Sequence, residues 1–455
     1  MITFDLKTLP GWETLAQGKC ILQIVARAEN LIDSNKSDPI EFEGPPDYLC
    51  FTAEKAGSTV AMAVKGTPTK GQAFETSTDG TNWSVFTPGT TTITLANAGD
   101  KVYFRGDNTT VSESSSIYYN FVMSGKIAAS GNIMSLLDKT CQSTTISNNY
   151  CYYNMFFGCT SLTTAPALPA TTLAVYCYSY MFYGCTSLTT APELPATTLA
   201  NYCYHSMFSK CTSLTTAPEL PATTLASNCY SSMFLNCISL TTGPSILPAT
   251  TLARYCYLSM FYGCTSLTTA PELPATTLAR DCYSSMFQGC TSLTTAPELP
   301  ATTLAISCYN SMFLGCTSLT TAPALPATTL ISGCYSYMFY GCTSLTTAPA
   351  LPATTLASNC YQYMFYSCTS LTTAPALPAT TLAASCYRNM FYGCTSLQVY
   401  SSSGTGHTKA WRIPTSGSAS SYTSQSEMFY NCPGSYTSSS TVSLNTTFYT
   451  QNTPV

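Results

Sequence analysis

Apolar residues return along most of the chain at one fixed spacing. The segment CYSYMFYGCTSLTTAPELPATTLANY, residues 177–202, recurs almost unchanged from Cys151 to Leu397. Its leading cysteine occurs ten times, at Cys151, Cys177, Cys203, Cys229, Cys256, Cys282, Cys308, Cys334, Cys360 and Cys386. The step is 26 residues, with one step of 27 residues at GPSILP, residues 243–248. Such a period predicts a solenoid, in which each repeat is one coil that buries its apolar face against its neighbours.

Within one repeat, the pattern predicts a short helical segment followed by two extended sides. Counting the leading cysteine as position 1, apolar residues occupy positions 1, 5, 6 and 9, which favours one face of a short helix or 3₁₀ segment. The β-branched run TSLTTA, residues 186–191, suits one rung of a parallel sheet. Pro192 and Pro195 cannot donate to a ladder and therefore predict a corner. A second extended side, ATTLA, follows at residues 196–200 with Leu199 inward.

Several columns of identical residues are expected to form the core. Each repeat carries methionine at position 5, followed by phenylalanine, and we expect core packing here rather than a metal relay. The tyrosine after each leading cysteine is expected to pack on its own column. Of the 24 cysteines, 20 stand at positions 1 and 9. Metal sites, disulfides and buried thiol columns all remain possible, and the spacing favours buried thiols.

The residues before the repeats predict small β units. Residues 1–48 carry three strand-like runs, which suggest part of an immunoglobulin- or fibronectin-like sandwich. The rest of that sandwich is absent, comes from a partner or comes from the next domain. Residues 49–125 alternate apolar and polar positions over six runs and predict a more complete β-sandwich-like domain. We expect Trp83, Tyr103 and Phe104 to lie in the core or half-buried in its sheets.

Two further segments flank the array. Residues 126–150 lead into the first repeat, and the apolar run Ile133–Leu137 is expected to close its open end as an N-terminal cap. Residues 398–455 are expected to form a C-terminal cap and a strand-like tail, in which EMFYNC, residues 427–432, is a degenerate copy of YMFYGC. The predicted architecture is mainly β with short helical segments, a ten-coil leucine-rich-repeat-type solenoid over residues 151–397 preceded by small β-sandwich domains.

Composition narrows the range of functions. Charged residues make up 8% of the chain and the net charge is −4, without a basic run, which disfavours nucleic-acid binding. Hydrophobic residues at 45% are too many for disorder, and no apolar run reaches the roughly 20 residues of a membrane span. The first 20 residues do not resemble a secretory signal peptide. We therefore expect a chain that stays inside the cell, leaves by another route such as lysis, or has a leader outside this sequence.

No residues indicate catalysis. The chain has two histidines, His205 at a variable position and His407 in a serine- and glycine-rich tail, and neither has an obvious nucleophile and acid partner. We expect no enzyme activity, no cofactor and no metal. Ice binding is disfavoured because adjacent threonines, such as Thr163 and Thr164, are expected to point to opposite sides.

Variable positions are the informative ones in an array this regular. Positions 4 and 7 lie three residues apart, so on a helical segment they would share an exposed face. Tyrosine is frequent at both and offers large, rigid contacts with a polar tip. The candidate binding stripe consists of Tyr180, Tyr183, Tyr262, Tyr337, Tyr340, Tyr363, Tyr366 and Tyr392. A merely tolerant solvent face is the alternative.

A second candidate is the glutamate column at position 17. It consists of Glu193, Glu219, Glu272 and Glu298. Stacked carboxylates repel one another, so these side chains are expected to face solvent, either as plain corner charges or as a weak Ca²⁺ site.

The phrase MFxGCTSL, followed by a proline corner and a second leucine side, resembles the BspA-like leucine-rich repeats. The resemblance covers residues 151–397, although the 26-residue unit is a few residues longer than usual and prolines replace the β-branched strand centre. The segments before the repeats are similar to those in proteins of gut Bacteroidota and their phages. The resemblance implies a non-enzymatic surface or virion protein with adhesive function, and it transfers no binding residue.

The function expected is an adhesive or structural protein on a virion surface, such as a phage fibre or decoration protein that binds host glycan or surface protein. The alternative is a secreted or cell-surface bacterial adhesin. Residues 1–125 would contact other virion or envelope proteins. Homo-oligomerisation is plausible for a fibre, and neither nucleic acid nor a membrane span is expected.

Overall fold

The computed structural model describes residues 46–405, 427–434 and 447–450, and the backbone of four short strands outside those ranges. The molecule is mainly β with almost no helix. Most of residues 1–48, including ITFDL at residues 2–6, the first of the three strand-like runs, lies outside the described residues. His407 and much of the expected C-terminal tail lie outside them too. Of the first segment, only the antiparallel pair β1 (Cys20–Leu22) and β2 (Ile40–Phe42) is described.

Two antiparallel sheets follow the runs of alternating residues. Their strands are β3 (Leu49–Ala53), β4 (Ser58–Lys65), β5 (Phe74–Ser77), β6 (Ser84–Phe86), β7 (Thr92–Leu95), β8 (Lys101–Gly106) and β9 (Tyr118–Ser124). Strands β3, β8, β5 and β6 lie side by side in one sheet, and β7, β4 and β9 form the other. Phe51 and Phe104 of the first sheet contact Phe121 of the second, with ring centroids 4.8 and 5.2 Å apart. As expected, Phe104 is buried and Trp83 is half-buried.

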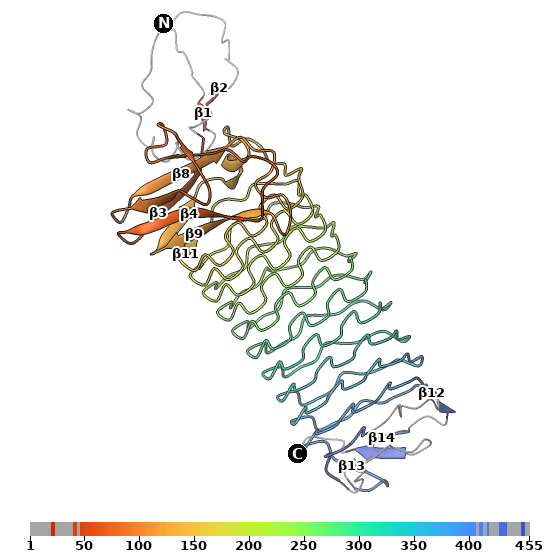
Figure 1. Cartoon of the computed structure of the whole chain (residues 1–455). Coiled ribbons are helices and arrows are strands. Elements are labelled where there is room, and N and C mark those ends of the chain that lie inside the picture. Colours follow the sequence, from red (N-terminus) through yellow and green to blue (C-terminus); the bar gives the residue numbers. More distant parts are fainter. Residues whose placement is uncertain are drawn as a thin grey trace, which may run out of the picture.

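The first sheet continues directly into the repeats. Strand β10 (Ile127–Ser130) pairs antiparallel with β3 on one side and parallel with β11 (Leu162–Thr164) of the first coil on the other. The 3₁₀ helix η2 (Ile133–Leu136) follows, and all four of its residues are buried. Figure 1 shows these strands at one end of a long stack of coils.

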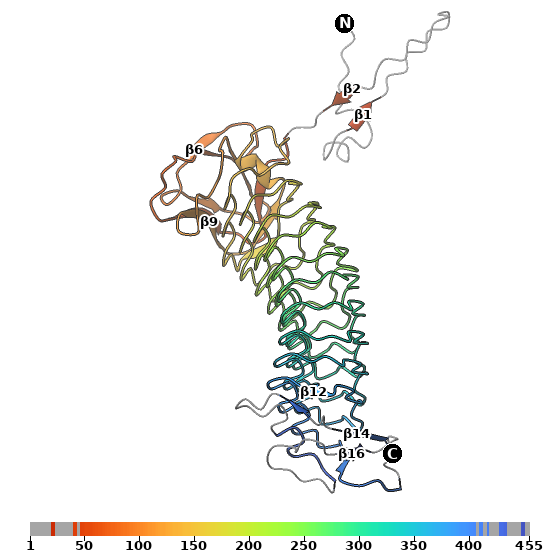
Figure 2. The ribbon, with the colours of Figure 1, turned by 90° about the vertical axis from the view of Figure 1, so that its right-hand side faces the viewer.

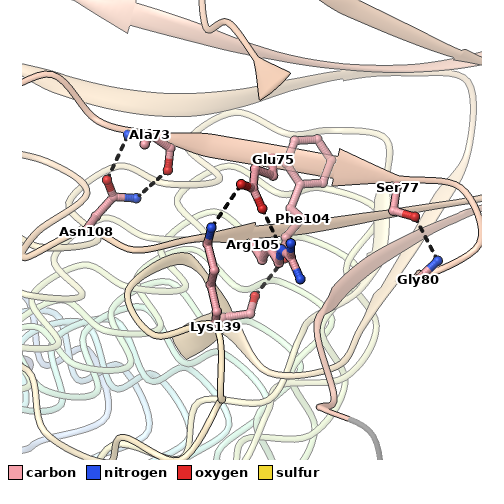
Figure 3. Close-up of polar contacts among 9 residues, drawn as sticks. Ala73, Glu75, Ser77, Gly80, Phe104, Arg105, Asn108 and Lys139 are labelled. Atoms are coloured by element: carbon pink, nitrogen blue, oxygen red, sulfur yellow. Dashed lines mark hydrogen bonds and ion pairs between the residues drawn. The ribbon is translucent and has the colours of Figure 1, made fainter. Parts of the chain in front are cut away.

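A polar contact joins the first sheet to the segment that caps the coils. The Glu75 carboxylate on β5 accepts from Arg105 Nε of β8 at 2.6 Å and from Lys139 Nζ at 2.9 Å (Figure 3). These two donors lower the pKa of Glu75. The Arg105 guanidinium also lies 3.9 Å from the centre of the Trp83 ring. The sheet and the residues after η2 are therefore tied together by charge as well as by apolar packing.

The repeats stack because each coil begins with a run of linked turns that donates hydrogen bonds forward. At even positions the backbone N–H donates to the next coil, so Tyr178 donates to the Cys203 carbonyl at 3.0 Å and Phe182 to the Met207 carbonyl at 2.9 Å. At odd positions the N–H instead donates to the carbonyl three residues back, closing a turn within the coil. The coils consequently lie one above another along the axis, as Figures 1 and 2 show.

The helix expected over this run is not there. The residues at positions 4 and 8, and the residue immediately before each leading cysteine, have positive φ, for example 57° at Tyr180 and 71° at Gly184. A right-handed helix cannot contain a left-handed residue at every fourth position. The linked turns repeat every four residues, a period close to that of a helix, so the apolar residues at positions 1, 5, 6 and 9 still face the interior. The same period explains why the sequence pattern favours a helix here.

The two extended sides are reduced to single bridges in most coils. The last threonine of TSLTTA forms a parallel bridge with its counterpart one coil on, as in Thr190↔Thr216. On the other side, Thr198↔Thr224 is the equivalent bridge, and Leu199 beside it is buried as expected. The proline segments between the two sides contain no strand in the described coils.

The threonine pairs do not divide between two faces. In the coils after the first, both members are exposed nearly throughout, as at Thr189 and Thr190 or Thr294 and Thr295. The argument from orientation against ice binding is therefore wrong. Exposed glutamates such as Glu193 nevertheless stand between the two threonine pairs of several coils, and charges there suit a flat ice lattice poorly.

The interior consists of continuous columns. The methionines at position 5 are fully buried, and the phenylalanines beside them stack at 5.2–5.7 Å from Phe156 to Phe429. The tyrosines at position 2 form a second stacked column, as predicted, with centroids 5.6–6.0 Å apart. The expected buried cysteine columns are present at positions 1 and 9. At position 9 the thiol donates to the phenylalanine carbonyl of the preceding coil, as Cys290 does to Phe261 at 3.1 Å.

The C-terminal residues add a partial coil. Phe391 donates to the Met428 carbonyl and Gly393 to the Tyr430 carbonyl, so EMFYNC continues the turn run as the degenerate repeat that the sequence suggested. Three further short strands form a small sheet, in the order β13 (Val399–Tyr400), β16 (Thr447–Thr450) and β14 (Lys409–Arg412). β12 (Thr381–Leu382) pairs in parallel with β15 (Ser416–Gly417).

We predict that Phe287→Ala destabilises the array by about 3–5 kcal/mol, because it opens a cavity in a column that runs through every coil. Urea unfolding followed by circular dichroism measures the cost. Gln288→Ala, at the adjacent partly exposed position, is the control and should change stability by no more than about 0.5 kcal/mol. A cost for Phe287→Ala as small as that of the control would contradict the stacked-column account.

Candidate functional site

The tyrosines of the candidate stripe lie on the turn run, partly exposed in every case. Those at position 4 have positive φ, of 57° at Tyr180, 57° at Tyr337 and 55° at Tyr363. Positions 4 and 7 are neighbours in space as expected, although the reason is the turn geometry and not a helix. The ring centroids of Tyr337 and Tyr340 are 6.2 Å apart, and those of Tyr363 and Tyr366 are 5.7 Å apart.

The last coils bring most of the stripe together into two parallel ladders, which we call the C-terminal tyrosine ladder. At position 4, Tyr337 stacks on Tyr363 at 4.7 Å. At position 7, Tyr340 stacks on Tyr366 at 4.6 Å, Tyr366 on Tyr392 at 4.5 Å, and Tyr392 on Tyr430 at 4.8 Å. Five of the eight predicted tyrosines therefore form one continuous surface.

The other three predicted tyrosines lie apart from that surface. Tyr262 stands between Leu235 and Gln288 at position 7, so neighbouring coils give it no ring to extend a ladder. Tyr180 and Tyr183 lie in the second coil, 5.9 Å apart, within a separate group of rings. The single stripe expected along the array is thus divided into two aromatic regions separated by coils that carry serine at position 4.

The group near the first coils, the N-terminal aromatic cluster, includes residues that sequence reasoning missed. Tyr176 stacks between Tyr150 and Tyr202 at 4.7 and 4.5 Å, each of the three standing immediately before a leading cysteine. Tyr153 joins this stack to Tyr180. The candidate stripe was defined by positions 4 and 7 alone, so these tyrosines were left out, although tyrosine precedes three successive leading cysteines.

Tyr430 was also missed, although its signal was present. It occupies position 7 of the degenerate repeat EMFYNC, and extending the ten-fold alignment by one repeat would have placed it on the ladder.

One cation stands beside each of the two aromatic regions. The Lys210 ammonium lies 5.2 Å from the centre of the Tyr183 ring, and the Arg388 guanidinium lies 5.9 Å from that of Tyr363. Within a ladder, each ring face is covered by the next ring. The ladders therefore present ring edges and hydroxyl groups, and ring edges carry the positive part of the aromatic quadrupole.

His205 lies inside the N-terminal aromatic cluster. Its Nε2 is 3.0 Å from the Tyr180 hydroxyl, and its ring meets Tyr180 and Tyr202 edge to face. Burial lowers the pKa of His205 to about 4, so the imidazole is neutral at pH 7. The Ser206 hydroxyl lies 3.4 Å from the same Nε2 atom, and no carboxylate lies within ion-pair distance of His205 among the described residues. The ring contacts of His205 are those of a packing residue.

The glutamate column is exposed, as expected. Glu219 accepts from the backbone N–H and hydroxyl of Ser245 in the next coil, at 3.1 and 2.9 Å. In the residues that the structure describes, no group of three or more His, Cys, Asp or Glu side chains could hold a metal ion. A helix with the length and apolarity to cross a bilayer does not occur in the described part of the chain either.

Comparison with known families identifies the repeats. The model of the BspA type leucine rich repeat region matches residues 138–260, 249–372 and 309–408. These matches cover more than half of the chain, and the chain belongs to the BspA-type leucine-rich-repeat family. This family is typically a non-enzymatic scaffold or adhesin and is surface-associated or extracellular.

Among solved structures, a leucine-rich repeat protein from Bacteroides ovatus is similar, with 20% identity and a TM-score of 0.33. The similarity covers 56% of this chain and 68% of that protein. A search of curated proteins gave no match.

We predict that His205 makes the protein less stable in mild acid. Its pKa is about 4 in the folded chain and near 6.5 when unfolded, so between these values the unfolded chain binds a proton that the folded chain does not. Stability should fall as the pH drops from about 6.5 to about 4, by roughly 1–3 kcal/mol from this group.

Urea unfolding of wild type and of His205→Ser at pH 7 and pH 4.5 measures the effect. Serine is the natural residue at this position in other coils, such as Ser179 and Ser231. The serine variant should lose less stability on acidification than wild type. Equal losses in the two proteins would show that His205 titrates normally.

Proposed function

We propose that this protein is a non-enzymatic adhesin displayed at a surface, and that the C-terminal tyrosine ladder is its contact with host glycan or host surface protein. The first setting proposed is a virion, as a phage fibre or decoration protein. A secreted or cell-surface bacterial adhesin is the second candidate, and membership of a surface-associated repeat family favours both.

The observation that carries this proposal is the continuous ladder of half-buried tyrosines over the last coils. Rigid rings with polar tips make large contacts at little cost in conformational entropy. The equivalent position 4 in the middle coils holds serine, so packing of the coil does not require tyrosine.

Backbone strain supports the same proposal. Tyr337 and Tyr363 have φ of 57° and 55°, a left-handed conformation that a bulky residue adopts at a cost of about 1–2 kcal/mol. The tenth coil carries Asn389 at this position, and asparagine tolerates that conformation well. The turn run imposes this conformation on position 4 of every coil, so the fold needs the left-handed residue but does not need it to be tyrosine. The extra cost of tyrosine at Tyr337 and Tyr363 is the kind of strain found at functional sites.

The architecture suits display. We infer that the ten stacked coils form a leucine-rich-repeat-type solenoid and that the two N-terminal sheets form a β-sandwich-like unit that continues into it through β10 and β11. Such a rod would hold the ladder away from whatever residues 1–125 attach to. Other virion or envelope proteins are the partners proposed for that segment.

We predict that replacing Tyr337, Tyr340, Tyr363, Tyr366 and Tyr392 together by serine weakens binding to cells of gut Bacteroidota at least about tenfold, because aromatic residues contribute most of the energy of such contacts. Binding of fluorescent protein to cells, titrated by flow cytometry, measures the change. Tyr262→Ser, which removes a tyrosine outside both aromatic regions, is the control and should bind as wild type does.

Unfolding must be measured for both variants, so that a folded but non-binding ladder variant is distinguished from a misfolded one. A folded ladder variant with unchanged binding would refute the assignment of the site. Cryo-electron microscopy of the source virion or envelope tests the setting separately: a symmetric projection on a virion supports the fibre, and a soluble cytoplasmic monomer contradicts both adhesin forms.

A further inference from the structure

Charges in the repeats are divided between two parts of each coil. From Cys151 to Leu397 the turn run and the two residues before it carry four cations and one anion: Lys210, Arg254, Arg280, Arg388 and Asp281. The proline corner carries four anions and no cation: Glu193, Glu219, Glu272 and Glu298. The side with the tyrosines is therefore positive, and the corner is negative, although the chain as a whole has a net charge of −4.

The cations lie where an anionic ligand could reach them. Lys210, Arg254 and the half-buried Arg388 have no carboxylate within ion-pair distance in the described ranges, whereas Arg280 pairs with Asp281 at 3.1 Å. Lys210 and Arg388 are held against Tyr183 and Tyr363. Each of these two cations therefore stands beside an aromatic region.

The shape of this surface is linear. Coils stacked at about 4.8 Å per step give a strip about 40 Å long between the first and last leading cysteines. Its stacked rings expose edges with partial positive charge and hydroxyl donors, and both favour a partner rich in oxygen acceptors. Two aromatic regions spaced along the stack, with Lys210 and Arg388 beside them and Arg254 between them, fit an extended polymer better than one globular protein.

Resting on the proposed function and deepening it, we propose that the tyrosine-bearing side of the coils binds a linear anionic polysaccharide, with Lys210, Arg254 and Arg388 contacting its carboxylate or sulfate groups and the tyrosine hydroxyls donating to its hydroxyl oxygens.

The test uses the full chain and two soluble polymers, polygalacturonate, which carries carboxylates, and dextran, which is neutral. We expect binding to immobilised polygalacturonate in biolayer interferometry and at least about tenfold weaker binding to dextran. Raising the salt from about 0.05 M to about 0.5 M should weaken the first interaction, because exposed charges are screened. Equal binding to the two polymers, or binding that salt does not change, would overturn the inference.

A matched pair of variants locates the site. The triple variant Lys210→Gly, Arg254→Ser and Arg388→Ser uses residues that other coils carry at these positions, and it should bind polygalacturonate about tenfold more weakly. The control replaces Glu193, Glu219, Glu272 and Glu298 by alanine, which the corner of other coils carries. It changes the net charge more, yet should bind at least as well as wild type. Weakening by neither variant, or by the control alone, would contradict the assignment.

The outcomes separate this inference from the proposed function. If cell binding depends on the tyrosine ladder but polygalacturonate does not bind, the adhesin stands and the anionic polymer is wrong. If cell binding depends on the three cations but disappears after protease treatment of the cells and survives periodate oxidation of their glycans, the partner is an acidic protein and the polysaccharide inference is overturned.

Discussion

Every described coil depends on backbone N–H groups that donate to the next coil. Alternate residues of the turn run use their hydrogen bonds between coils, and the residues between them close turns within the coil. A coil alone would leave half of these groups unsatisfied, which is costly in a buried backbone. The same constraint aligns identical residues into columns. A single substitution in the core therefore changes the packing against both neighbouring coils.

The alignment also determines what the surface can display. A residue at position 4 or 7 is repeated at the coil spacing, so adjacent tyrosines must stack and present their edges, as Tyr366 does between Tyr340 and Tyr392. Substitutions at a few variable positions therefore change the surface of each coil while its backbone and core stay the same. Aromatic regions lie near both ends of the array, serine-rich coils lie between them, and cations and anions occupy different segments of the coil.

Much of the fold could be predicted from the sequence, because residues that recur at a fixed spacing occupy equivalent places in successive coils. The buried methionine, phenylalanine, tyrosine and cysteine columns follow from residues that recur at one spacing. The helix at positions 1–9 could not be excluded, since a left-handed residue at every fourth position leaves no clear signal when tyrosine, serine and asparagine share it. Glycine at position 8, and asparagine at several of the other left-handed positions, are the local indications of positive φ.

The site was predictable only in part. Positions 4 and 7 were correctly expected to be neighbours, but the division into two regions needs the three-dimensional contacts of Tyr150, Tyr176 and Tyr202, which stand on a different part of the repeat. The cation contacts of Lys210 and Arg388 likewise arise from turn geometry that spacing alone does not specify.

Hydroxyl-radical footprinting of the full chain, with and without bound polygalacturonate, tests the central claim most directly, because it reads the exposure of individual side chains. Our account predicts protection of the ladder tyrosines, with unchanged reactivity at the proline corners. These tyrosines are Tyr337, Tyr340, Tyr363, Tyr366, Tyr392 and Tyr430. Protection of the corners, with the tyrosines still reactive, would show that the coils bind through the opposite part of their surface and would contradict the account.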